Sequence, residues 1–384
     1  MFLSFAHLIN FANPKAPKGL IRSAEKWVDE HCEKHVSICQ PQPIAYYKKV
    51  SKAEENIYLI DKHSPKSPFD EFQNVRWTVT PEMTLFYLQG ARLLGDEAAV
   101  ISSDNRVFCE FTYPPSLNWL DHACFKRRRI PSVMPLKGWY ATVTYPASRF
   151  YFHWMLESLP RMSLLENHVD ILDGLFVPAH LENFHRQSLQ MLGIPESKLI
   201  PVSTESHFQP EHLFVPKMCA IYNPPGWLHH WYKDKYLGLS KEEKRNDFKR
   251  KRIYISRSDA NARRVNNEDQ VIAALAKLGF DSVTLSDKTF YEQARLFNRA
   301  DIIVAPHGAG LSNIVFCRAD AKVIEIFPPR WMAPCFMTLA LSVGCNYEYL
   351  VAEEAVSTSN LSLPQFRDIE VPVQRLTEAL KKHL

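Results

Sequence analysis

The sequence is poor in glycine and lacks the short motifs of several common enzyme classes. Only 12 of its 384 residues are Gly, about 3% where about 7% is usual, so two glycines close together need an explanation. There is no G-x-S-x-G nucleophile elbow and no Walker A sequence, which argues against a serine hydrolase and a P-loop nucleotidase. No G-x-G-x-x-G follows a predicted strand, so a Rossmann-type oxidoreductase is also disfavoured.

The chain also lacks recognisable metal motifs and a strong net charge. It has neither D-x-D nor H-E-x-x-H, and its densest group of metal-binding residue types has no standard zinc spacing: Asp29, His31, Cys32, His35 and Cys39. We therefore expect no metal and no cofactor. The 46 Lys and Arg residues against 42 Asp and Glu give a net charge of +4, too little to predict binding to duplex nucleic acid.

Nothing in the sequence predicts a membrane-spanning segment or a disulfide framework. The eight Cys residues include no C-x-x-C pair, so we expect reduced thiols in a reducing compartment. No stretch approaches the ~18 apolar residues of a transmembrane helix. The apolar start, residues 1–12, has neither a basic n-region nor an A-x-A-like cleavage site, and predicts a buried or membrane-touching helix. These features favour a cytoplasmic protein, with a peripheral contact at the inner face of the membrane as a further expectation.

A local cationic run, KRRR at 126–129, follows the first strand-like segments. Two interpretations stay open for it: a solvated loop, or a contact with an anionic membrane surface or an acidic glycan.

The pattern of the chain predicts an α/β protein, and its length suggests two domains. In the first half, a parallel α/β arrangement is indicated by strand-like runs at 171–177, 199–202 and 212–215 and a helix at 181–192. In the second half, strands alternate with helices: strands at 252–256, 282–285, 301–305 and 322–327, helices at 268–278, 290–299 and 309–316. This alternation is typical of a doubly wound nucleotide-binding sheet, whose ligands lie at the carboxyl ends of the strands. We expect the domain boundary near 225–250.

Two of the few glycines lie two residues apart directly after the third of these strands, in PHGAGLSN at 306–313. At such a place the backbone can approach a phosphate group, and N–H groups at a helix N-terminus face it. His307 would add a proton donor to the same anion. A tight strand-to-helix turn without a ligand is the alternative, since G-x-G alone is a weak signal.

Three arginines follow the first of these strands: Arg257, Arg263 and Arg264. Arg binds phosphate oxygens bidentately, and Asn266 or Asn267 can cap the next helix, with acidic side chains in its first turn. Taken alone, the segment could be an exposed polar loop. Because this segment and residues 306–313 lie at the same edge of the sheet, together they predict a diphosphate site.

A third segment, FHWMLESLPR at 152–161, places polar side chains four residues apart. If the segment is helical, His153, Glu157 and Arg161 share one face, and Pro160 should kink or end the helix. The imidazole and the carboxylate could then deprotonate a hydroxyl group while the guanidinium holds a leaving phosphate. A salt-bridged helix face is the alternative.

Glu325 lies within the apolar strand KVIEIF at 322–327, where its carboxylate should be buried. A buried carboxylate needs partners. Two remain open: a ribose diol of a ligand, or an Arg on a neighbouring strand.

Together, these segments resemble glycosyltransferase family 61. The resemblance rests on FHWMLESLPR, on YISRSDANARRVNNEDQV at 254–271, and on DIIVAPHGAGLSNIVFC with KVIEIFPP between 301 and 329. It spans roughly residues 150–350 in order, and the first 85 residues resemble nothing recognisable.

The resemblance implies a GT-B-like fold, with two Rossmann-type domains facing across a cleft. These would be an N-terminal acceptor-side domain (1–230), a C-terminal nucleotide-sugar-binding domain (231–350), and a tail (351–384) that packs back on the first domain. It also implies an inverting enzyme that needs no metal. The donor site carried over from the family consists of Arg257, Arg263, Arg264, Asn267, Glu268, His307, Gly308, Ala309, Gly310, Asn313 and, for the ribose, Glu325.

The resemblance further implies that the catalytic base lies in the 153–161 segment. We assign this role to Glu157, with His153 as the acceptor-positioning group or substitute base and Arg161 as support for the phosphate. The expected substrates are a nucleotide-sugar, with UDP-sugars favoured, and a hydroxyl group of a glycan or glycolipid in capsular or other surface polysaccharide synthesis. Two alternatives stay open: a protein O-glycosyltransferase, and a non-catalytic nucleotide- or glycan-binding protein on the same fold.

Overall fold

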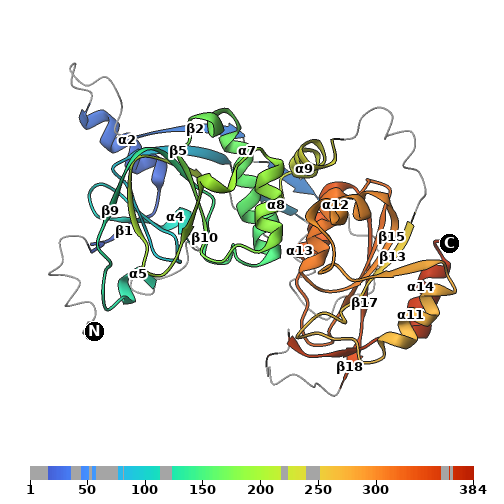
Figure 1. Cartoon of the computed structure of the whole chain (residues 1–384). Helices are drawn as coiled ribbons and strands as arrows, with labels where there is room; N and C mark the ends of the chain where they lie inside the picture. Colours follow the sequence, from blue (N-terminus) through green and yellow to red (C-terminus); the bar gives the residue numbers. More distant parts are fainter. Residues whose placement is uncertain are drawn as a thin grey trace. The chain divides into compact units, whose positions relative to one another are not determined.

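The protein is a mixed α/β chain that divides into two compact units (Figure 1). Unit 1 comprises residues 1–53 and 81–219, and unit 2 comprises residues 54–80 and 220–384. The structure, a computed structural model, describes residues 16–35, 45–51, 54–57, 77–80, 82–112, 123–217, 224–238, 251–355, 363 and 366–384. Among them, no helix is both long and apolar enough to span a membrane.

Unit 1 is built on one mixed sheet. Its strands are β1 (Leu20–Ile21), β2 (Ala45–Ser51), β5 (Met83–Gln89), β6 (Arg92–Leu94), β7 (Ala99–Ile101), β8 (Val107–Phe108), β9 (Met134–Thr142), β10 (Gly174–Pro178), β11 (Leu199–Val202) and β12 (His207–Lys217). Their order is β1-β8-β7-β6-β12-β9-β10-β11, and β5 pairs with both β2 and β12. Strands β9 to β12 form the parallel part, because β10 pairs in parallel with β9 and β11, and β12 pairs in parallel with β9.

The helices of unit 1 are mostly short. They are α2 (Ala24–His35), α4 (Cys109–Thr112), α5 (Ala123–Lys126), α6 (Tyr151–His153), the π-helical turn η2 (Trp154–Ser158), η3 (Leu159–Arg161), α7 (Met162–Leu165), η4 (Glu166–Ile171), α8 (Asn183–Met191) and η5 (Glu196–Lys198). The elements from α6 to η4 follow one another without a break, between residues 151 and 171.

Pro160 was expected to kink or end this helix, but the helical path continues through it. Proline has no N–H group, and its ring clashes with the carbonyl group four residues earlier. The chain accommodates this by a π turn before Pro160, in which the N–H of Leu159 donates to the carbonyl of Trp154, and by a 3₁₀ turn at Pro160 itself. A π turn inside a helix is frequently found at functional sites.

Unit 2 contains a five-stranded sheet in which all strands are parallel. Its strands are β13 (Lys251–Ile255), β14 (Phe280–Val283), β15 (Ala300–Pro306), β16 (Lys322–Phe327) and β17 (Asn346–Val351), in the order β14-β13-β15-β16-β17. Two small antiparallel pairs complete its strands: β3 (Glu54–Ile57) with β4 (Trp77–Thr80), and β18 (Glu353–Glu354) with β19 (Ile369–Glu370). The strand order reverses between β13 and β15, and ligands of such sheets bind at the carboxyl ends of the strands at this switch point.

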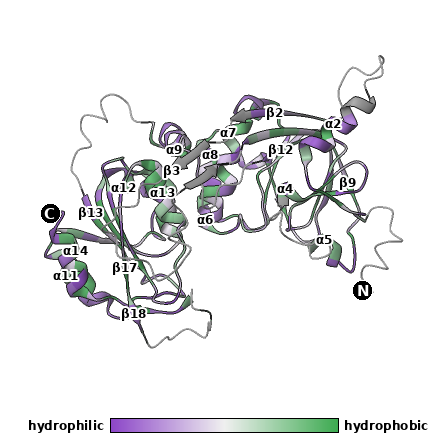
Figure 2. Ribbon diagram, turned by 180° about the vertical axis from the view of Figure 1, so that it is seen from behind, coloured by the Kyte–Doolittle hydropathy of each residue, from purple (hydrophilic) through white to green (hydrophobic). Residues whose placement is uncertain are grey.

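Helices cover both faces of this sheet (Figure 1). They are α9 (Leu228–Leu237), α11 (Glu268–Ala276), α12 (Phe290–Arg299), η6 (Ala309–Phe316), α13 (Cys335–Val343) and α14 (Val373–Lys381). Helices α11 and α14 share one core with the sheet, through Val271, Leu275, Leu376 and Leu380. Both helices carry hydrophobic and hydrophilic residues (Figure 2), which is typical of a helix that buries one side only.

The observed division of the chain differs from the expected one in three respects. Unit 2 starts at residue 220 rather than 231, and it also takes in residues 54–80. The tail 351–384, expected to pack back on the N-terminal domain, packs on unit 2, because the apolar side of α14 is buried in the core shared with α11.

Two elements of unit 2 also differ from their expected form. The helix expected at 309–316 is a 3₁₀ helix, and the second strand, expected at 282–285, runs from 280 to 283. The apolar start, residues 1–12, lies outside the described residues.

A buried histidine connects α8 to the loop before the long helical path of unit 1. His185 is fully buried, its Nε2 lies 3.0 Å from the carbonyl oxygen of Ser148, and its Nδ1 accepts the N–H of Glu182 at 2.9 Å. Burial lowers the pKa of His185 from 6.5 to about 4. The ring is therefore neutral at pH 7, with its proton on Nε2.

We predict that acidification destabilises the protein partly through His185. Because its folded-state pKa is the lower one, the stabilisation by the neutral ring is complete above about pH 6.5 and is lost as the pH falls towards 4. The difference between the two pKa values corresponds to about 3 kcal/mol. Urea unfolding near pH 7 and near pH 4.5 should show a smaller acid-induced loss for His185→Gln, which keeps a donor but does not titrate. An equal loss in both proteins would contradict this assignment.

Candidate functional site

The helical path of unit 1 brings two of the expected catalytic residues together. His153 ends α6, and its Nδ1 is hydrogen-bonded to Oε2 of Glu157 in the π turn. The side chain of Glu157 is 5% exposed, whereas that of His153 is 28% exposed. Because Nδ1 faces the carboxylate, Nε2 is the ring nitrogen left for a substrate. Glu157 therefore orients His153, in the manner of a carboxylate that fixes the tautomer of a catalytic imidazole.

Arg161 lies on the same helical path but does not join the two side chains as expected. Its Nε donates to the backbone carbonyl of Glu157 at 2.9 Å, and its guanidinium carbon lies 5.6 Å from the centre of the Tyr145 ring. The residue is 2% exposed. Arg161 thus stabilises the π turn that carries Glu157, and in this structure it does not face solvent.

In unit 2, two segments meet at the switch point of the sheet. One is the loop after β13 that carries Arg257, Arg263 and Arg264 (the arginine loop), and the other is the turn after β15 with Gly308 and Gly310 (the glycine turn). Arg257 follows β13, and one of its guanidinium nitrogens, Nη1, lies 2.3 Å from where a Cβ atom on Gly308 would be. A side chain at position 308 would therefore displace Arg257. Gly308 has an extended backbone, so its role here is to leave space for the guanidinium rather than to adopt a special conformation.

Arg257 and Arg263 form a partly buried cationic pair. The Nε atoms of both are buried and have no hydrogen-bond partner among the residues that the structure describes. Burial and the charge of Arg257 lower the pKa of Arg263 to about 10. Arg263 also has a left-handed backbone, with φ of 56°, which costs a non-glycine residue about 1–3 kcal/mol. Two guanidinium groups with unused donors and a strained backbone are typical of an anion site.

His307 and Glu325 lie next to these arginines, and both are buried. Nδ1 of His307 is hydrogen-bonded to Oε1 of Glu325, and the hydroxyl of Tyr347 donates to Oε2 at 2.5 Å. Glu325 is fully buried and each of its oxygens accepts a hydrogen bond, so its assignment to a ribose diol does not fit this structure. Its partners are a His and a Tyr rather than the neighbouring-strand Arg that was the second expectation.

Two expected donor-site residues hold the backbone of the arginine loop instead of facing the arginines. Oε1 of Glu268 accepts the N–H of Arg257 at 2.9 Å and the hydroxyl of Tyr254 at 3.0 Å. Asn267 exchanges two hydrogen bonds with the backbone of Val371, of 2.8 and 2.9 Å, and its side chain does not cap α11. These contacts stabilise both ends of the loop.

The remaining residues of the glycine turn have mainly packing roles. A Cβ atom on Gly310 would lie 2.6 Å from Cδ1 of Leu285, so a larger residue would clash there. Asn313 is fully buried and donates to Gln293 and to the carbonyl of Gly310, each at 3.0 Å. Ala309 is half-buried at the start of η6, where the first N–H groups of a helix have no acceptor within it.

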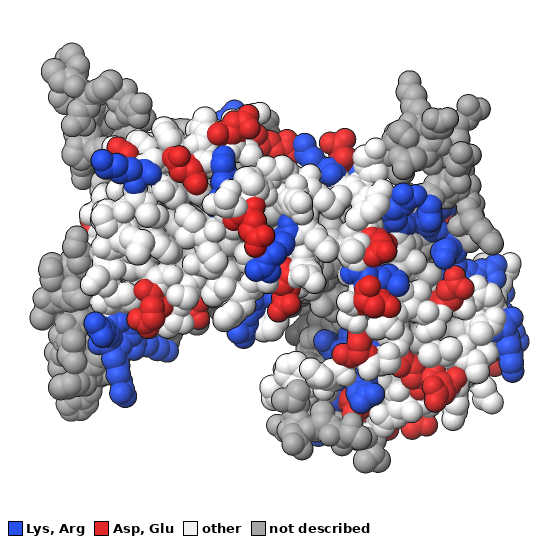
Figure 3. Space-filling view, viewed as in Figure 1, with Lys and Arg blue, Asp and Glu red and all other residues white. Residues whose placement is uncertain are grey.

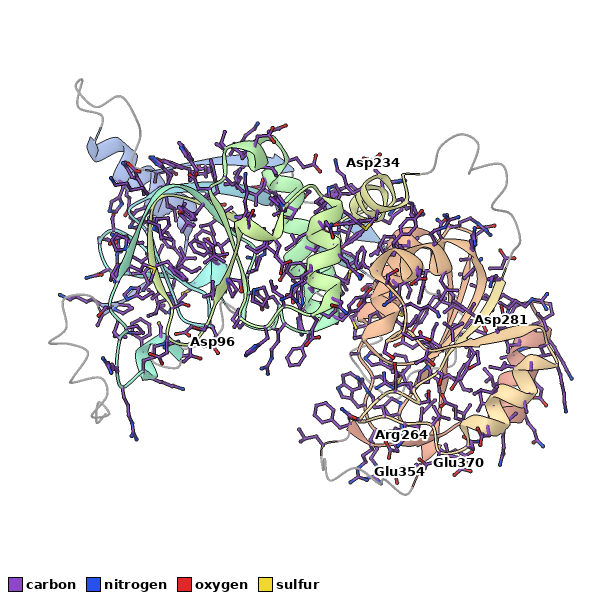
Figure 4. All side chains as sticks on the ribbon, in the orientation of Figure 1. Asp96, Asp234, Arg264, Asp281, Glu354 and Glu370 are labelled. Atoms are coloured by element: carbon purple, nitrogen blue, oxygen red, sulfur yellow. The ribbon has the colours of Figure 1, made fainter. Side chains whose placement is uncertain are left out.

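Arg264 differs from its two neighbours in the loop. Its side chain is exposed, and its backbone N–H donates to Asp368 at 2.9 Å. Figure 4 labels it in the same part of unit 2 as Glu354 and Glu370, which belong to the pair β18–β19. The structure therefore groups Arg257 and Arg263 with His307 and does not include Arg264.

Two aromatic residues at this site were missed by sequence reasoning. Tyr347 lies on β17, which had not been predicted, although the alternation in NYEYLV at 346–351 is the pattern of a strand. Trp331 lies 4.7 Å from the His307 ring and 5.8 Å from the guanidinium of Arg263, measured to ring centres. It follows β16 in a Pro-rich turn that gives no signal of its own.

Within the described ranges, no three His, Cys, Asp or Glu side chains are grouped closely enough to hold a metal ion. In the segment 29–39, His31 stacks on the ring of Trp27, with 4.0 Å between the ring centres. The charges of Arg263 and Arg257 both act on His307.

The same segments are similar in sequence to known glycosyltransferases. A sequence model described as glycosyltransferase 61 matches residues 151–324. The beta-1,2-xylosyltransferase XAX1 of Oryza sativa subsp. japonica is 39% identical over 111 residues, which cover 27% of this chain and 19% of that protein. The human protein O-linked-mannose beta-1,4-N-acetylglucosaminyltransferase 2 is 30% identical over 110 residues, again 27% of this chain and 19% of the relative.

The matched segments thus make up about a fifth of the length of either relative. The family match begins at the helical path of His153 and ends within β16, so it takes in both groups of residues described above. Residues 151–324 of the chain are thus similar to glycosyltransferase family 61.

Proposed function

We propose that this protein is an inverting, metal-independent glycosyltransferase that moves a sugar from a nucleotide-diphosphate sugar, with UDP-sugars favoured, to a hydroxyl group. The observation that carries the proposal is the pair Arg257 and Arg263 at the switch point of the unit 2 sheet, each with a buried Nε that lacks a partner among the described residues. A diphosphate would supply both the negative charge and the acceptor oxygens that these groups lack.

The proposed donor site consists of Arg257, Arg263, His307 and the first N–H groups of η6, at Ala309 and Gly310. The two guanidinium groups stabilise the charge that develops on the departing diphosphate, which is the role a divalent cation has in metal-dependent transferases. No cofactor is part of this proposal.

His153 is the proposed catalytic base. Its Nε2 removes the proton of the acceptor hydroxyl while the oxygen attacks the anomeric carbon, and the bond to the diphosphate breaks on the opposite side of the sugar. The electron pair of that bond stays on the diphosphate. Glu157 holds the ring by Nδ1 and stabilises the imidazolium that forms. This exchanges the roles first assigned to the two residues, because His153 is the more exposed of the pair.

The proposal includes a GT-B arrangement, with unit 1 as the acceptor side and unit 2 as the donor side. The parallel, doubly wound sheet of unit 2 supports this for the donor side. For the acceptor we favour a glycan or glycolipid in surface polysaccharide synthesis. The name of the human relative favours a second candidate, a protein O-glycosyltransferase. A non-catalytic nucleotide-binding protein remains the alternative from another class, and would bind UDP without turnover.

We predict that Arg263→Ala weakens donor binding at least tenfold while Arg264→Ala has little effect. The two residues are adjacent, but only Arg263 lies beside His307, and a lost pair of charge-assisted hydrogen bonds should weaken binding at least tenfold. Thermal shift with UDP, GDP and CDP and their sugars, with and without EDTA, measures this effect. Equal binding by wild type and Arg263→Ala would count heavily against the donor site.

We also predict that His153→Ala loses transfer about 10²- to 10⁴-fold, the usual contribution of a general base, with donor binding retained. Added imidazole should restore part of the rate, because it can occupy the space left by the ring. Glu157→Gln should also be slow but should gain nothing from imidazole, since its own imidazole is still present. Near-normal turnover of His153→Ala with the best donor and acceptor pair would exclude His153 as the base.

Peripheral membrane contact is a further part of the proposal. Lys126, Arg128 and Arg129 are exposed beside α5, whereas Arg127 is held by Glu97 and by the carbonyl of Thr204. Figure 3 shows Lys and Arg side chains near the position of α5, next to a group of Asp and Glu side chains. Flotation with anionic liposomes should recover the wild type. The triple change of Lys126, Arg128 and Arg129 to Glu should reduce this recovery. No recovery of the wild type would remove this part.

A further inference from the structure

Two buried side chains, His307 and Glu325, and the half-buried Tyr347 form one hydrogen-bonded chain on adjacent elements of unit 2. Tyr347 of β17 donates to Oε2 of Glu325 in β16 at 2.5 Å, and Oε1 of Glu325 is bonded to Nδ1 of His307 at the end of β15. His307 directly follows β15 at the carboxyl edge of the sheet, where the proposed diphosphate site is, whereas Glu325 and Tyr347 lie within their strands. Among the described residues, neither Tyr347 nor Glu325 is hydrogen-bonded to Arg257 or Arg263, so both would act on the site through His307.

The hydrogen bonds among Tyr347, Glu325 and His307 determine which nitrogen of His307 carries a proton. Burial and the charge of Glu325 raise the pKa of Tyr347, so its hydroxyl keeps its proton and donates. The carboxylate therefore accepts on both oxygens, and Nδ1 of His307 is the donor on the other side. A neutral His307 consequently has its lone pair on Nε2.

The groups that face His307 decide its charge. Glu325 favours the imidazolium, while Arg257 and Arg263, from the loop after β13, oppose it. The aromatic rings of Phe327, Trp331 and Phe336 surround the imidazole. The thiol of Cys335, from α13, stays neutral because burial raises its pKa. Burial is the dominant influence and lowers the pKa of His307, so the ring is neutral when no anion is bound.

From this geometry we infer that Tyr347 and Glu325 are positioning residues that make diphosphate binding take up a proton at His307. The inference rests on the proposed function, since it requires a diphosphate at Arg257 and Arg263. The anion offsets the charge of the two arginines, so the imidazolium is no longer opposed. Nε2 then gains a proton from solvent and donates it to a phosphate oxygen, while Glu325 stabilises the cation through Nδ1.

A purely structural role makes a different prediction. If the three side chains only connect β15, β16 and β17, changing them should lower the melting temperature and leave the proton count of binding unchanged. Proton uptake therefore separates a positioning role from a structural one, which stability alone cannot do.

The test is calorimetric titration of the full-length chain with UDP in buffers that differ in ionisation enthalpy. The slope of binding enthalpy against ionisation enthalpy gives the number of protons taken up. We expect the wild type to take up protons on binding and His307→Gln not to take them up. Any proton contributed by UDP itself is the same for both proteins, so it cancels in the difference between them. Tyr347→Phe and Glu325→Gln should take up fewer protons and bind UDP about tenfold more weakly, the size of one charge-assisted hydrogen bond.

Tyr349→Phe is the matched control. Tyr349 is the direct cross-strand partner of Glu325 on β17, but its ring packs against Phe327. The hydrogen bond to Glu325 comes from Tyr347. We expect wild-type affinity and proton uptake for this variant. Glu325→Gln serves as the second variant if Tyr347→Phe does not fold.

Two results would overturn the inference. If folded Tyr347→Phe and Glu325→Gln bind UDP with wild-type affinity and proton uptake, the positioning role is wrong and the proposed function stands. If the wild type binds neither UDP nor GDP nor CDP, the proposed donor site fails, and this inference fails with it.

Discussion

The repulsion between Arg257 and Arg263 is the constraint on which the unit 2 site depends. Removing two like charges from water costs several kcal/mol for each charge unless opposite charges or aromatic faces lie close by. The fold provides Glu325, whose charge offsets part of the lowering of the Arg263 pKa, and the Trp331 ring beside the same guanidinium. It also provides the extended backbone of Gly308, against which Arg257 lies. These features keep the two arginines together without pairing their Nε atoms with other described residues.

In unit 1 the comparable constraint is a proline inside a helix. The chain continues through Pro160 only by widening the turn before it, and Glu157 lies in that wider turn. The π turn thus has two effects: it removes the clash that a proline would cause, and it sets the direction of a carboxylate toward His153. Arg161 stabilises the same turn through the carbonyl of Glu157.

Much of unit 2 was predictable because its signals are local. Apolar runs separated by amphipathic stretches predicted four of the five parallel strands, and the loops after β13 and β15 lie where the strand order reverses. The partners of buried charges were not predictable, since Glu325, His307 and Tyr347 meet only through the lateral order of the strands. The contacts of the two glycines were not predictable either: a Cβ atom on Gly308 would meet Arg257, and one on Gly310 would meet Leu285. Pairing of Asn267 with Val371 is likewise invisible in a sequence, because 104 residues separate them.

The segment around Val371 has a consequence for what counts as the smallest unit of this fold. It exchanges backbone hydrogen bonds with the arginine loop at Arg263, Asn266 and Arg264, and it holds Asn267. The similarity to glycosyltransferase family 61 stops at residue 324, within β16, before β17 and before this segment. The residues that match the family model therefore end before the residues around Val371 that hold the arginine loop. An isolated fragment with the limits of the family match would contain the arginines but not the backbone that holds them, so sequence similarity and folding autonomy have different borders in this molecule.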